Sequence, residues 1–222
     1  MTVGKTILLI GPPGAGKTTI ANLLTQETGM AVIATGQRLR TEIRAQSPIG
    51  RQIAALLEQG QLVPDAVMAE LMRAWLQTIP PSQSCLLDGY PRSIAQAQML
   101  DTMLAELRRQ VNVVIVLDLS ETAIMHRLGG RRVCRSPDGR DVTLHIDDTE
   151  QVAQCLAKGG VLSQRDDDRP EVIRARLRLY EQETTPVLDF YRHRGLVHHI
   201  NADQSPEMVV AAINRVLQDH YI

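Results

Sequence analysis

The chain has 222 residues, 44% of them hydrophobic, and 24 Lys and Arg residues against 25 Asp and Glu residues give a formal net charge of −1. This length predicts one domain with inserted pieces, and the near-neutral charge argues against the overall basic field of a nucleic-acid-binding protein. No apolar run is long enough to cross a bilayer and an apolar strand starts close to the amino terminus, so we expect a cytoplasmic protein with no secretory leader and no membrane partner.

Short apolar runs alternate with stretches of helical periodicity, which predicts an α/β fold of three layers around a five-stranded parallel sheet. The predicted strands are residues 6–10, 31–34, 85–88, 111–117 and 196–200. The predicted helices are residues 18–28, 36–45, 49–59, 65–78, 93–108, 121–128, 170–194 and 205–219. Residues 35–63 hold helices but no strand, and residues 131–164 are polar and weakly periodic, which predicts a structureless connection such as a lid.

The first strand runs directly into a glycine-rich loop, residues 11–18, with the sequence GPPGAGKT. Its glycines allow the backbone N–H groups to turn inward around an anion, and the following helix adds its positive end. Lys17 would reach the outer phosphates of a nucleotide and the Thr18 hydroxyl would bind the Mg²⁺ that bridges them. A simple Gly-Pro turn is the alternative, but the spacing and the flanking strand and helix favour a polyphosphate site.

A second motif follows the predicted strand that ends at Asp88. At the tip of a strand beside the phosphate loop, the Asp88 carboxylate would organise Mg²⁺ through water, although it could also only cap the next turn. Gly89 permits close backbone approach, and Arg92 points outward to hold a phosphate. We predict a cis bond between Tyr90 and Pro91, because cis bonds favour tight turns before proline.

Arginines accumulate in the second half of the chain. A nucleoside triphosphate facing a monophosphate carries roughly six negative charges, more than one lysine and one Mg²⁺ neutralise. The candidates are Arg127, Arg131, Arg132, Arg165 and Arg176. We interpret Arg108, Arg109 and Arg174, on helix faces, as solvated surface charges. In the run 165–170 we expect Arg165 to bind phosphate and the carboxylates to hold arginines in place.

Six motifs, standing in one order and spacing, together resemble the adenylate kinase family of nucleoside monophosphate kinases over essentially the full chain. They are residues 11–19, 35–36, 60–65, 88–92, 127–132 and 165–168. The resemblance implies a P-loop core of residues 1–34, 65–129 and 165–222, a helical AMP-binding insert of residues 35–64 and a lid of residues 130–164. It also implies a monomer that transfers a phosphoryl group reversibly from ATP to AMP with Mg²⁺, giving two ADP and serving adenine nucleotide homeostasis.

The resemblance also assigns site residues. For ATP they are Gly14, Ala15, Gly16, Lys17, Thr18, Thr19, Arg127, Arg131 and Gln204. For AMP they are Thr35, Arg40, Gln61, Leu62, Val63, Gly89, Tyr90, Pro91, Arg92, Gln96, Arg165 and Arg176. The catalytic set is Lys17, Arg92, Arg131, Arg165 and Arg176, and Thr18 and Asp88 would hold Mg²⁺ through water.

The AMP assignment is chemically sensible. Gln96 offers an amide donor and acceptor to the adenine edge, and Arg40 and Arg92 can clamp the AMP phosphate from two sides. Thr35 adds a hydroxyl facing the base. A kinase for CMP, UMP or dGMP and a regulatory module that has lost catalysis stay open as alternatives. The long lid with the pair Thr35 and Gln96 argues against the first, and the presence of every expected cation argues against the second.

The chain departs from the family pattern at three places. Thr18 stands where glycine is usual, and Gln37 where an acid is usual. Asp141 and Val142 occupy the place where zinc-free lids often carry an aromatic, which leaves the choice of nucleotide donor open.

The cysteines also depart from the family pattern. The three in the chain are too few and too scattered for a disulfide scaffold, and Cys85 fits a small core residue. Zinc-bearing members carry two Cys-x-x-Cys pairs, whereas here only Cys134 and Cys155 are present. Two thiolates, with His145 as the one further candidate ligand, argue against a structural zinc.

Overall fold

The computed structural model describes the backbone of residues 3–221 and the side chains of residues 3–219; residues 1, 2 and 222, which end the predicted core segments, lie outside it. Five parallel strands form the main sheet, which confirms the predicted α/β class. Across the sheet they are β2 (Ala31–Ala34), β3 (Cys85–Asp88), β1 (Thr6–Ile10), β4 (Val111–Asp118) and β8 (Val197–Asn201). Each strand lies within one residue of its predicted position.

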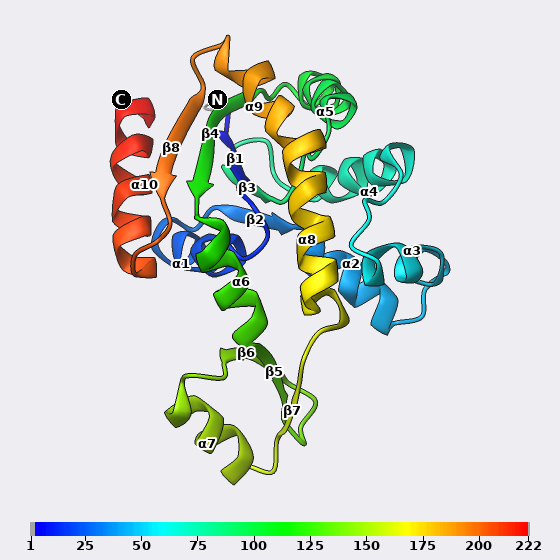
Figure 1. Cartoon of the computed structure of the whole chain (residues 1–222). Helices are drawn as coiled ribbons and strands as arrows, with labels where there is room; N and C mark the ends of the chain where they lie inside the picture. The colour runs from blue at the N-terminus through cyan, green and yellow to red at the C-terminus, as the bar shows by residue number, and fades with distance from the viewer. Residues whose placement is uncertain (1–2, 222) are drawn as a thin grey trace.

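Helices cover both faces of this sheet (Figure 1). Helices α1 (Lys17–Thr28) and α10 (Pro206–Tyr221) lie on one face, and α4 (Asp65–Gln77), α5 (Ile94–Glu106) and α9 (Thr185–Arg192) on the other. Alternate residues of β1 enter the two cores: Leu9 packs with Leu24 and Ile213, and Leu8 packs with Met72. Burial on both faces explains why the strands read as continuous apolar runs.

The predicted helix 170–194 consists of three parts. Helix α8 (Pro170–Leu179) is followed by a π-helical turn (Tyr180–Thr184) and then by α9. Pro186, in the first turn of α9, has no N–H to donate to the preceding turn, so the backbone widens there. Helix α6 (Glu121–Gly130) precedes the peripheral part of the chain and packs on α8 through Ile124, Leu128 and Ile173.

Helices α2 (Thr35–Arg44) and α3 (Pro48–Glu58) lie between β2 and α4, with no strand among them, as predicted. The Ser47 hydroxyl caps α3 by accepting from the Gly50 N–H. A Cβ on Gly50 would lie 2.1 Å from the Glu42 carbonyl oxygen, so this glycine lets the two helices pack closely. The pair forms a hairpin that projects from the carboxyl end of β2.

Residues 131–163, called here the small-sheet subdomain, fold into a second, antiparallel sheet that extends away from the main body (Figure 1). Its strands are β6 (Asp141–His145), β5 (Arg131–Arg135) and β7 (Val161–Ser163), with helix α7 (Thr149–Ala157) between β6 and β7. The predicted structureless connection is therefore wrong. The core here is only Cys134, Leu144 and Cys155 with two flanking residues, too small to create a visible hydrophobic period.

Cys134 and Cys155 form a disulfide that joins β5 to α7. The sequence interpretation missed this bond because the two cysteines stand 21 residues apart without a recognisable spacing. A Cβ on Gly160 would lie 2.7 and 2.8 Å from the two sulfurs, so only glycine fits beside the bond. Because the sulfurs bind each other, they do not form a zinc site. Cys85 is a free, buried core residue, as expected.

Arg109 is buried, with 6% of its surface exposed, so its interpretation as a surface charge was wrong. Its guanidinium donates to the carbonyl oxygens of Pro80 and Gln83 and so anchors the turn before β3. The chain reverses at Arg108, whose φ is 56°, and this turns the next side chain inward. Arg108 and Arg174 are exposed, as predicted.

Among the described helices none is both long and apolar enough to cross a bilayer.

Candidate nucleotide site

The phosphate loop connects β1 to α1 in a left-handed turn. Gly14 and Gly16 have φ values of 84° and 82°, a region that residues with a Cβ rarely adopt. Gly16 is the N-cap of α1, and no side chain caps the helix and no acidic residue lies in its first turn. The first N–H groups of α1 are therefore open to an anion, and the helix dipole favours one there.

Lys17 lies inside this loop. Its Nζ donates to the carbonyl oxygens of Gly11 and Pro12, both at 2.8 Å. Loss of hydration lowers the pKa of Lys17 to about 8; Asp88 opposes this shift and Arg92 adds to it. The ammonium group is thus held beside the loop at a cost in solvation that a phosphate would offset.

Thr18 and Asp88 meet because β1 and β3 pair in parallel, with Leu9 opposite Asp88. The Thr18 hydroxyl donates to Asp88 Oδ2 at 2.7 Å, and only 5% of Asp88 is exposed. One hydroxyl and one carboxylate beside a phosphate loop are a donor set that suits Mg²⁺, a hard cation that takes oxygen ligands. Thr19, next along α1, is exposed.

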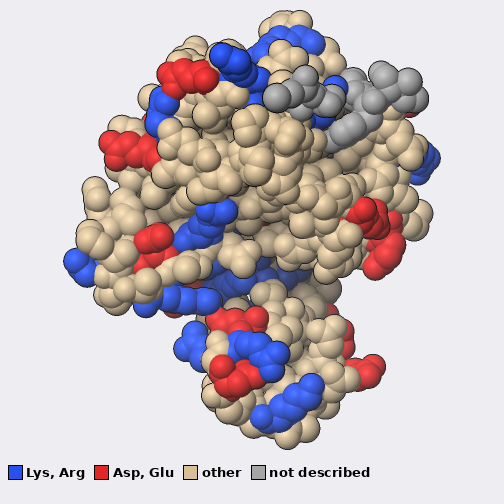
Figure 2. Space-filling model, turned by 180° about the vertical axis from the view of Figure 1, so that it is seen from behind, with Lys and Arg blue, Asp and Glu red and all other residues tan. Residues whose placement is uncertain are grey.

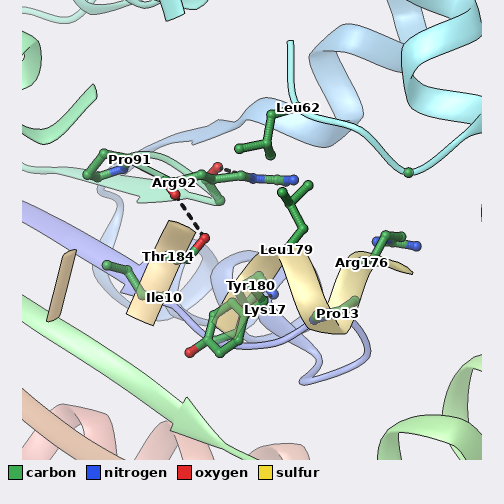
Figure 3. Close-up of a pocket in the computed structure, with 13 residues that line it drawn as sticks. Ile10, Pro13, Lys17, Leu62, Pro91, Arg92, Arg176, Leu179, Tyr180 and Thr184 are labelled. Atoms are coloured by element: carbon green, nitrogen blue, oxygen red, sulfur yellow. Dashed lines mark hydrogen bonds between the residues drawn. The ribbon is translucent and has the colours of Figure 1, made fainter. Parts of the chain in front are cut away.

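A cavity opens between this loop and the carboxyl end of β3. Figure 3 shows Lys17, Arg92 and Arg176 around it, with Leu62 and Tyr180 among the other lining residues. These five side chains come from α1, the turn after β3, α8, the segment after α3 and the π-helical turn. Three cationic side chains therefore converge on one cavity.

Arg92 is fixed by its own turn. Its Nε donates to the Gly89 carbonyl at 2.8 Å, and its carbonyl accepts from the Thr184 hydroxyl at 3.0 Å (Figure 3). The bond between Tyr90 and Pro91 is cis, as predicted. Burial, then the charge of Arg176, lowers the pKa of Arg92. Desolvated cations placed side by side favour an anionic ligand between them.

Carboxylates of residues 165–168 hold two of the arginines, as predicted. Asp168 is fully buried and accepts two hydrogen bonds from Arg131, that from Nε at 2.7 Å. Arg176 Nη1 donates to Asp167 Oδ2 at 3.0 Å. Arg165 instead donates to the Thr143 hydroxyl of the small sheet at 3.0 Å. Burial, followed by the charge of Arg131, lowers the pKa of Arg165.

Two residues predicted to face adenine are engaged with the protein itself. The Thr35 hydroxyl, buried, donates to the Asp88 carbonyl at 2.9 Å. Gln96 Nε2 donates to Asp65 Oδ1 at 2.7 Å, and its Oε1 accepts from the Arg92 N–H at 2.8 Å. Each end of the Gln96 amide keeps one further hydrogen or lone pair for a ligand. The Thr35 oxygen likewise keeps lone pairs that could accept a hydrogen bond from a base, so its assignment to the base stays a prediction.

The other predicted AMP residues are dispersed around the cavity. Leu62 and Pro91 line it, whereas Val63 is buried and Gln61 is exposed. Tyr90 is almost completely buried in the core, so its ring does not reach the cavity.

Arg40, on α2, stands apart from the cavity lining but close to the other cations. Burial, then the charges of Arg165 and other neighbours, lowers its pKa to about 10. Arg40 therefore shares the electrostatic environment of Arg131, Arg165 and Arg176.

Arg127 and Gln204 both donate to backbone carbonyls of the segment around the end of β8, and neither lines the cavity. Arg127 Nη2 donates to the Ala202 carbonyl at 2.9 Å, and Gln204 Nε2 donates to the Asn201 carbonyl at 2.8 Å. A second cavity, lined by Pro12, Tyr180 and Asp203 among others, lies beside them. Arg132 is turned back onto the Gly129 and Arg131 carbonyls, away from the cluster.

Three supporting residues escaped the sequence reasoning. Asp65, which positions Gln96, was interpreted as the start of a helix and as the end of motif 60–65, with no role of its own in the site. Thr143, the partner of Arg165, lies in a strand that no pattern indicated. Tyr180 lines both cavities from a helix that gave no sign of a π-turn.

Seen from the back of the molecule, Lys and Arg side chains gather along the junction between the main body and the small-sheet subdomain (Figure 2).

Comparison with known proteins gives a consistent result. Residues 9–196 match the family model described as "Adenylate kinase". A protein named adenylate kinase from Streptomyces griseus is 39% identical, over 88% of this chain and 90% of its own. The adenylate kinase from Symbiobacterium thermophilum is 38% identical over 96% of this chain and 98% of its own. The one from Methanothrix thermoacetophila is 35% identical over 95% of this chain and 97% of its own.

Proposed function

This chain belongs to the adenylate kinase family and is an ATP:AMP phosphotransferase, and we propose that the cavity between the phosphate loop and Arg92 is where the phosphoryl group passes. The observation that carries this placement is the convergence of Lys17, Arg92 and Arg176 on that one cavity. Burial and the neighbouring cations keep the pKa values of Lys17 and Arg92 lowered despite the charge of Asp88, so an anionic ligand there would stabilise their charged forms.

On the ATP side, the open N–H groups at the start of α1 take the phosphates. Lys17 leaves the carbonyls of Gly11 and Pro12 and turns to the outer phosphates. Arg127 and Arg131 cover the nucleotide, and the second cavity beside Gln204 is placed to receive the base.

On the AMP side, Arg40 and Arg92 hold the phosphate, and Gln96 offers its remaining hydrogen and lone pair to adenine. Residues 35–64 form the AMP-binding insert in this proposal. Residues 130–164 form the lid over ATP. Closure of both parts excludes water, which would otherwise compete with AMP as the acceptor.

The transfer needs positioning and charge rather than a covalent intermediate. Thr18 and Asp88 would hold Mg²⁺, which when bound neutralises charge on the phosphates. Arg131, Arg165 and Arg176 surround the equatorial oxygens of the group in transit, and one such arginine is worth roughly 10³–10⁵ in rate. Asp168 keeps the Arg131 fork in a fixed orientation.

The same proposal makes the protein a monomer that acts on free nucleotides in the cytoplasm. Every side chain assigned above comes from one chain, so a second copy is not needed to complete the site. The reaction would serve adenine nucleotide homeostasis by exchanging ATP, AMP and ADP.

A panel of nucleoside monophosphates, assayed for ADP formation with and without Mg²⁺, tests the substrate and metal assignment. We expect AMP to be the preferred acceptor and Mg²⁺ to be required; equal use of CMP or UMP would contradict the AMP site. Arg92→Ala should raise the KM for AMP much more than the KM for ATP. Arg132→Ala is the matched control, since it removes the same charge outside the cluster, and it should change neither KM by more than about twofold.

A further inference from the structure

Three metal-ligating side chains meet where α6 enters the small-sheet subdomain. His126 lies on α6, His145 ends β6, and Asp147 follows it. We propose that these residues bind one divalent transition-metal ion of the zinc and nickel class and so connect α6 to the small-sheet subdomain. Figure 1 shows this junction as the point where the peripheral part of the chain leaves the main body.

The spacing of the ligand atoms matches a shared ion. Asp147 Oδ2 lies 3.2 Å from His126 Nε2 and 3.4 Å from His145 Nδ1. One ligand atom from each residue lies within 4.8 Å of the other two. Zinc binds imidazole nitrogen and carboxylate oxygen at about 2.0–2.2 Å, which separates neighbouring ligand atoms on a tetrahedral ion by about 3.3–3.5 Å.

The hydrogen bonds of His145 favour the required tautomer. Its Nε2 lies 3.2 Å from the carbonyl oxygen of His126, and its Nδ1 lies 3.3 Å from the N–H of Asp147. A carbonyl only accepts and an N–H only donates, so these two partners favour a neutral ring with its proton on Nε2 and its lone pair on Nδ1, the atom that also faces Asp147 Oδ2. An imidazole that donates its other N–H to a carbonyl is the usual arrangement around a bound metal. A bound ion would replace the long bond from the Asp147 N–H and would lie between Asp147 Oδ2 and the two rings.

The backbone holds the two rings in place. The His126 and His145 rings are stacked, with centroids 5.0 Å apart and planes inclined by 28°. A Cβ on Gly130 would lie 2.0 Å from His145 Nε2, so the ring lies directly against a residue that has none. The Ile146 N–H also donates to the Gly130 carbonyl at 2.7 Å.

The donor set indicates which ions fit. Two imidazole nitrogens and one carboxylate oxygen suit Zn²⁺, Ni²⁺, Co²⁺ and Cu²⁺, whereas Mg²⁺ prefers oxygen alone. The site is therefore distinct from the Mg²⁺ position at Thr18 and Asp88. It is also distinct from the cysteines, whose sulfurs are joined to each other. His126 and Asp147 are 67% and 66% exposed, which leaves room for water at the remaining positions of the ion.

Calorimetric titration of the nucleotide-free full chain with ZnCl₂ and with NiCl₂, in a non-chelating buffer, tests the proposal. We expect one ion per chain, and we expect His126→Ala and Asp147→Asn each to weaken binding by about tenfold or more. His199→Ala is the matched control, because His199 also pairs with a carboxylate, Asp118 at 3.0 Å. It should bind the ions as the unchanged chain does.

Two further measurements separate the proposed site from other sources of binding. The double variant Cys134→Ser with Cys155→Ser should still bind one Ni²⁺, since no thiol takes part. Far-UV circular dichroism should show that His126→Ala, which changes an exposed side chain, keeps the fold. Absence of binding up to about 100 μM ion, or equal binding by His126→Ala and the unchanged chain, would overturn the proposal. Loss of binding in the cysteine variant, with its far-UV circular dichroism and the amide hydrogen exchange of β6 unchanged, would overturn it as well.

Discussion

Asp168 determines where two of the cations in the site lie. It is fully buried, it accepts both hydrogen bonds of the Arg131 fork, and Arg176 Nη1 lies 3.9 Å from its Oδ1. Such a carboxylate cannot be replaced by a neutral group of the same shape, because an amide presents a donor to the guanidinium. The carboxylate therefore orders the arginines before a nucleotide arrives.

We expect Asp168→Asn to lower the free energy of unfolding by about 2–4 kcal/mol, since it breaks a buried charge pair. It should also lower kcat by a larger factor than it changes the KM for either nucleotide, because Arg131 loses its orientation. Urea unfolding and steady-state kinetics measure the two effects. Asp166→Asn, at the exposed member of the same run, should change stability by less than about 0.5 kcal/mol. An equal effect at both positions would contradict the role given to Asp168.

The pKa of Lys17 gives a prediction about pH. Loss of hydration lowers it to about 8, and the charged form is the one that binds phosphate. The free enzyme therefore loses its binding form as the pH rises through about 8, and kcat/KM for ATP should fall by up to tenfold for each pH unit above that value. A titration from pH 7 to 9.5 avoids the second ionisation of the nucleotide phosphates, near pH 6.

Lys17→Arg is the control for this profile. A guanidinium stays charged over the whole range, so the fall in kcat/KM above pH 8 should disappear even though the absolute rate is lower. A flat profile of the unchanged chain to pH 9.5 would show that Lys17 keeps an ordinary pKa.

At the scale of elements, the sequence predicts the strands that are buried on both faces. It misses the strands of the small sheet, in which few residues are buried. The strands β1 and β4 read as apolar runs because both of their faces are covered. The phosphate loop was predictable because its function fixes residue types at fixed spacing. The strand β5, in contrast, is mostly charged, and only Val133 and Cys134 of its residues are buried. No local pattern could have indicated its partner strands or the bond to Cys155.

That disulfide should hold the small-sheet subdomain together. Joining residues 21 apart removes unfolded-state entropy worth about 3 kcal/mol. The double variant Cys134→Ala with Cys155→Ala should therefore increase amide hydrogen exchange in β5 and α7 by about a hundredfold, while β1 and β4 stay protected. Mass spectrometry of peptic fragments after exchange measures both regions.

A reductant should have the same effect on the unchanged chain. Cys85→Ala is the matched control, because this thiol is buried in the main core and the disulfide remains. That variant should keep the full response to reductant in β5 and α7. Exchange in those elements that ignores both reduction and substitution would show that the bond contributes nothing to their stability.

At the scale of the whole molecule, a net charge of −1 conceals an uneven distribution. Cations gather where the main body meets the small-sheet subdomain, as Figure 2 shows, and acidic side chains lie elsewhere or brace them. Sequence composition could exclude a basic surface but could not reveal this separation. The convergence depends on strand order. β1 and β3 are far apart in the sequence, but they pair in parallel with Leu9 opposite Asp88, which brings their carboxyl ends together.

An ion pair joins the hairpin of α2 and α3 to the small-sheet subdomain. Arg44, at the end of α2, pairs with Asp141 at the start of β6, with 2.6 Å between Nη2 and Oδ2. Asp141 is 17% exposed and Arg44 60%, so the pair is worth about 0.2–1 kcal/mol. In the proposed function these parts must separate to release products, and the pair therefore favours the closed arrangement.

We expect Arg44→Ala to reduce the ratio of closed to open molecules by up to about fivefold. Single-molecule energy transfer between dyes on α3 and α7 measures this ratio, and KM for both nucleotides should rise together. Arg135→Ala is the matched control, since Arg135 pairs with the same Asp141 at 3.3 Å but lies within the same small sheet. Arg135→Ala removes the same charge but breaks no contact between α2 and the small-sheet subdomain, so the ratio of closed to open molecules should stay unchanged. Because salt screens exposed pairs, the difference between the two variants should vanish at about 1 M salt; a difference that persists there would mean that Arg44 acts through packing and not through its charge.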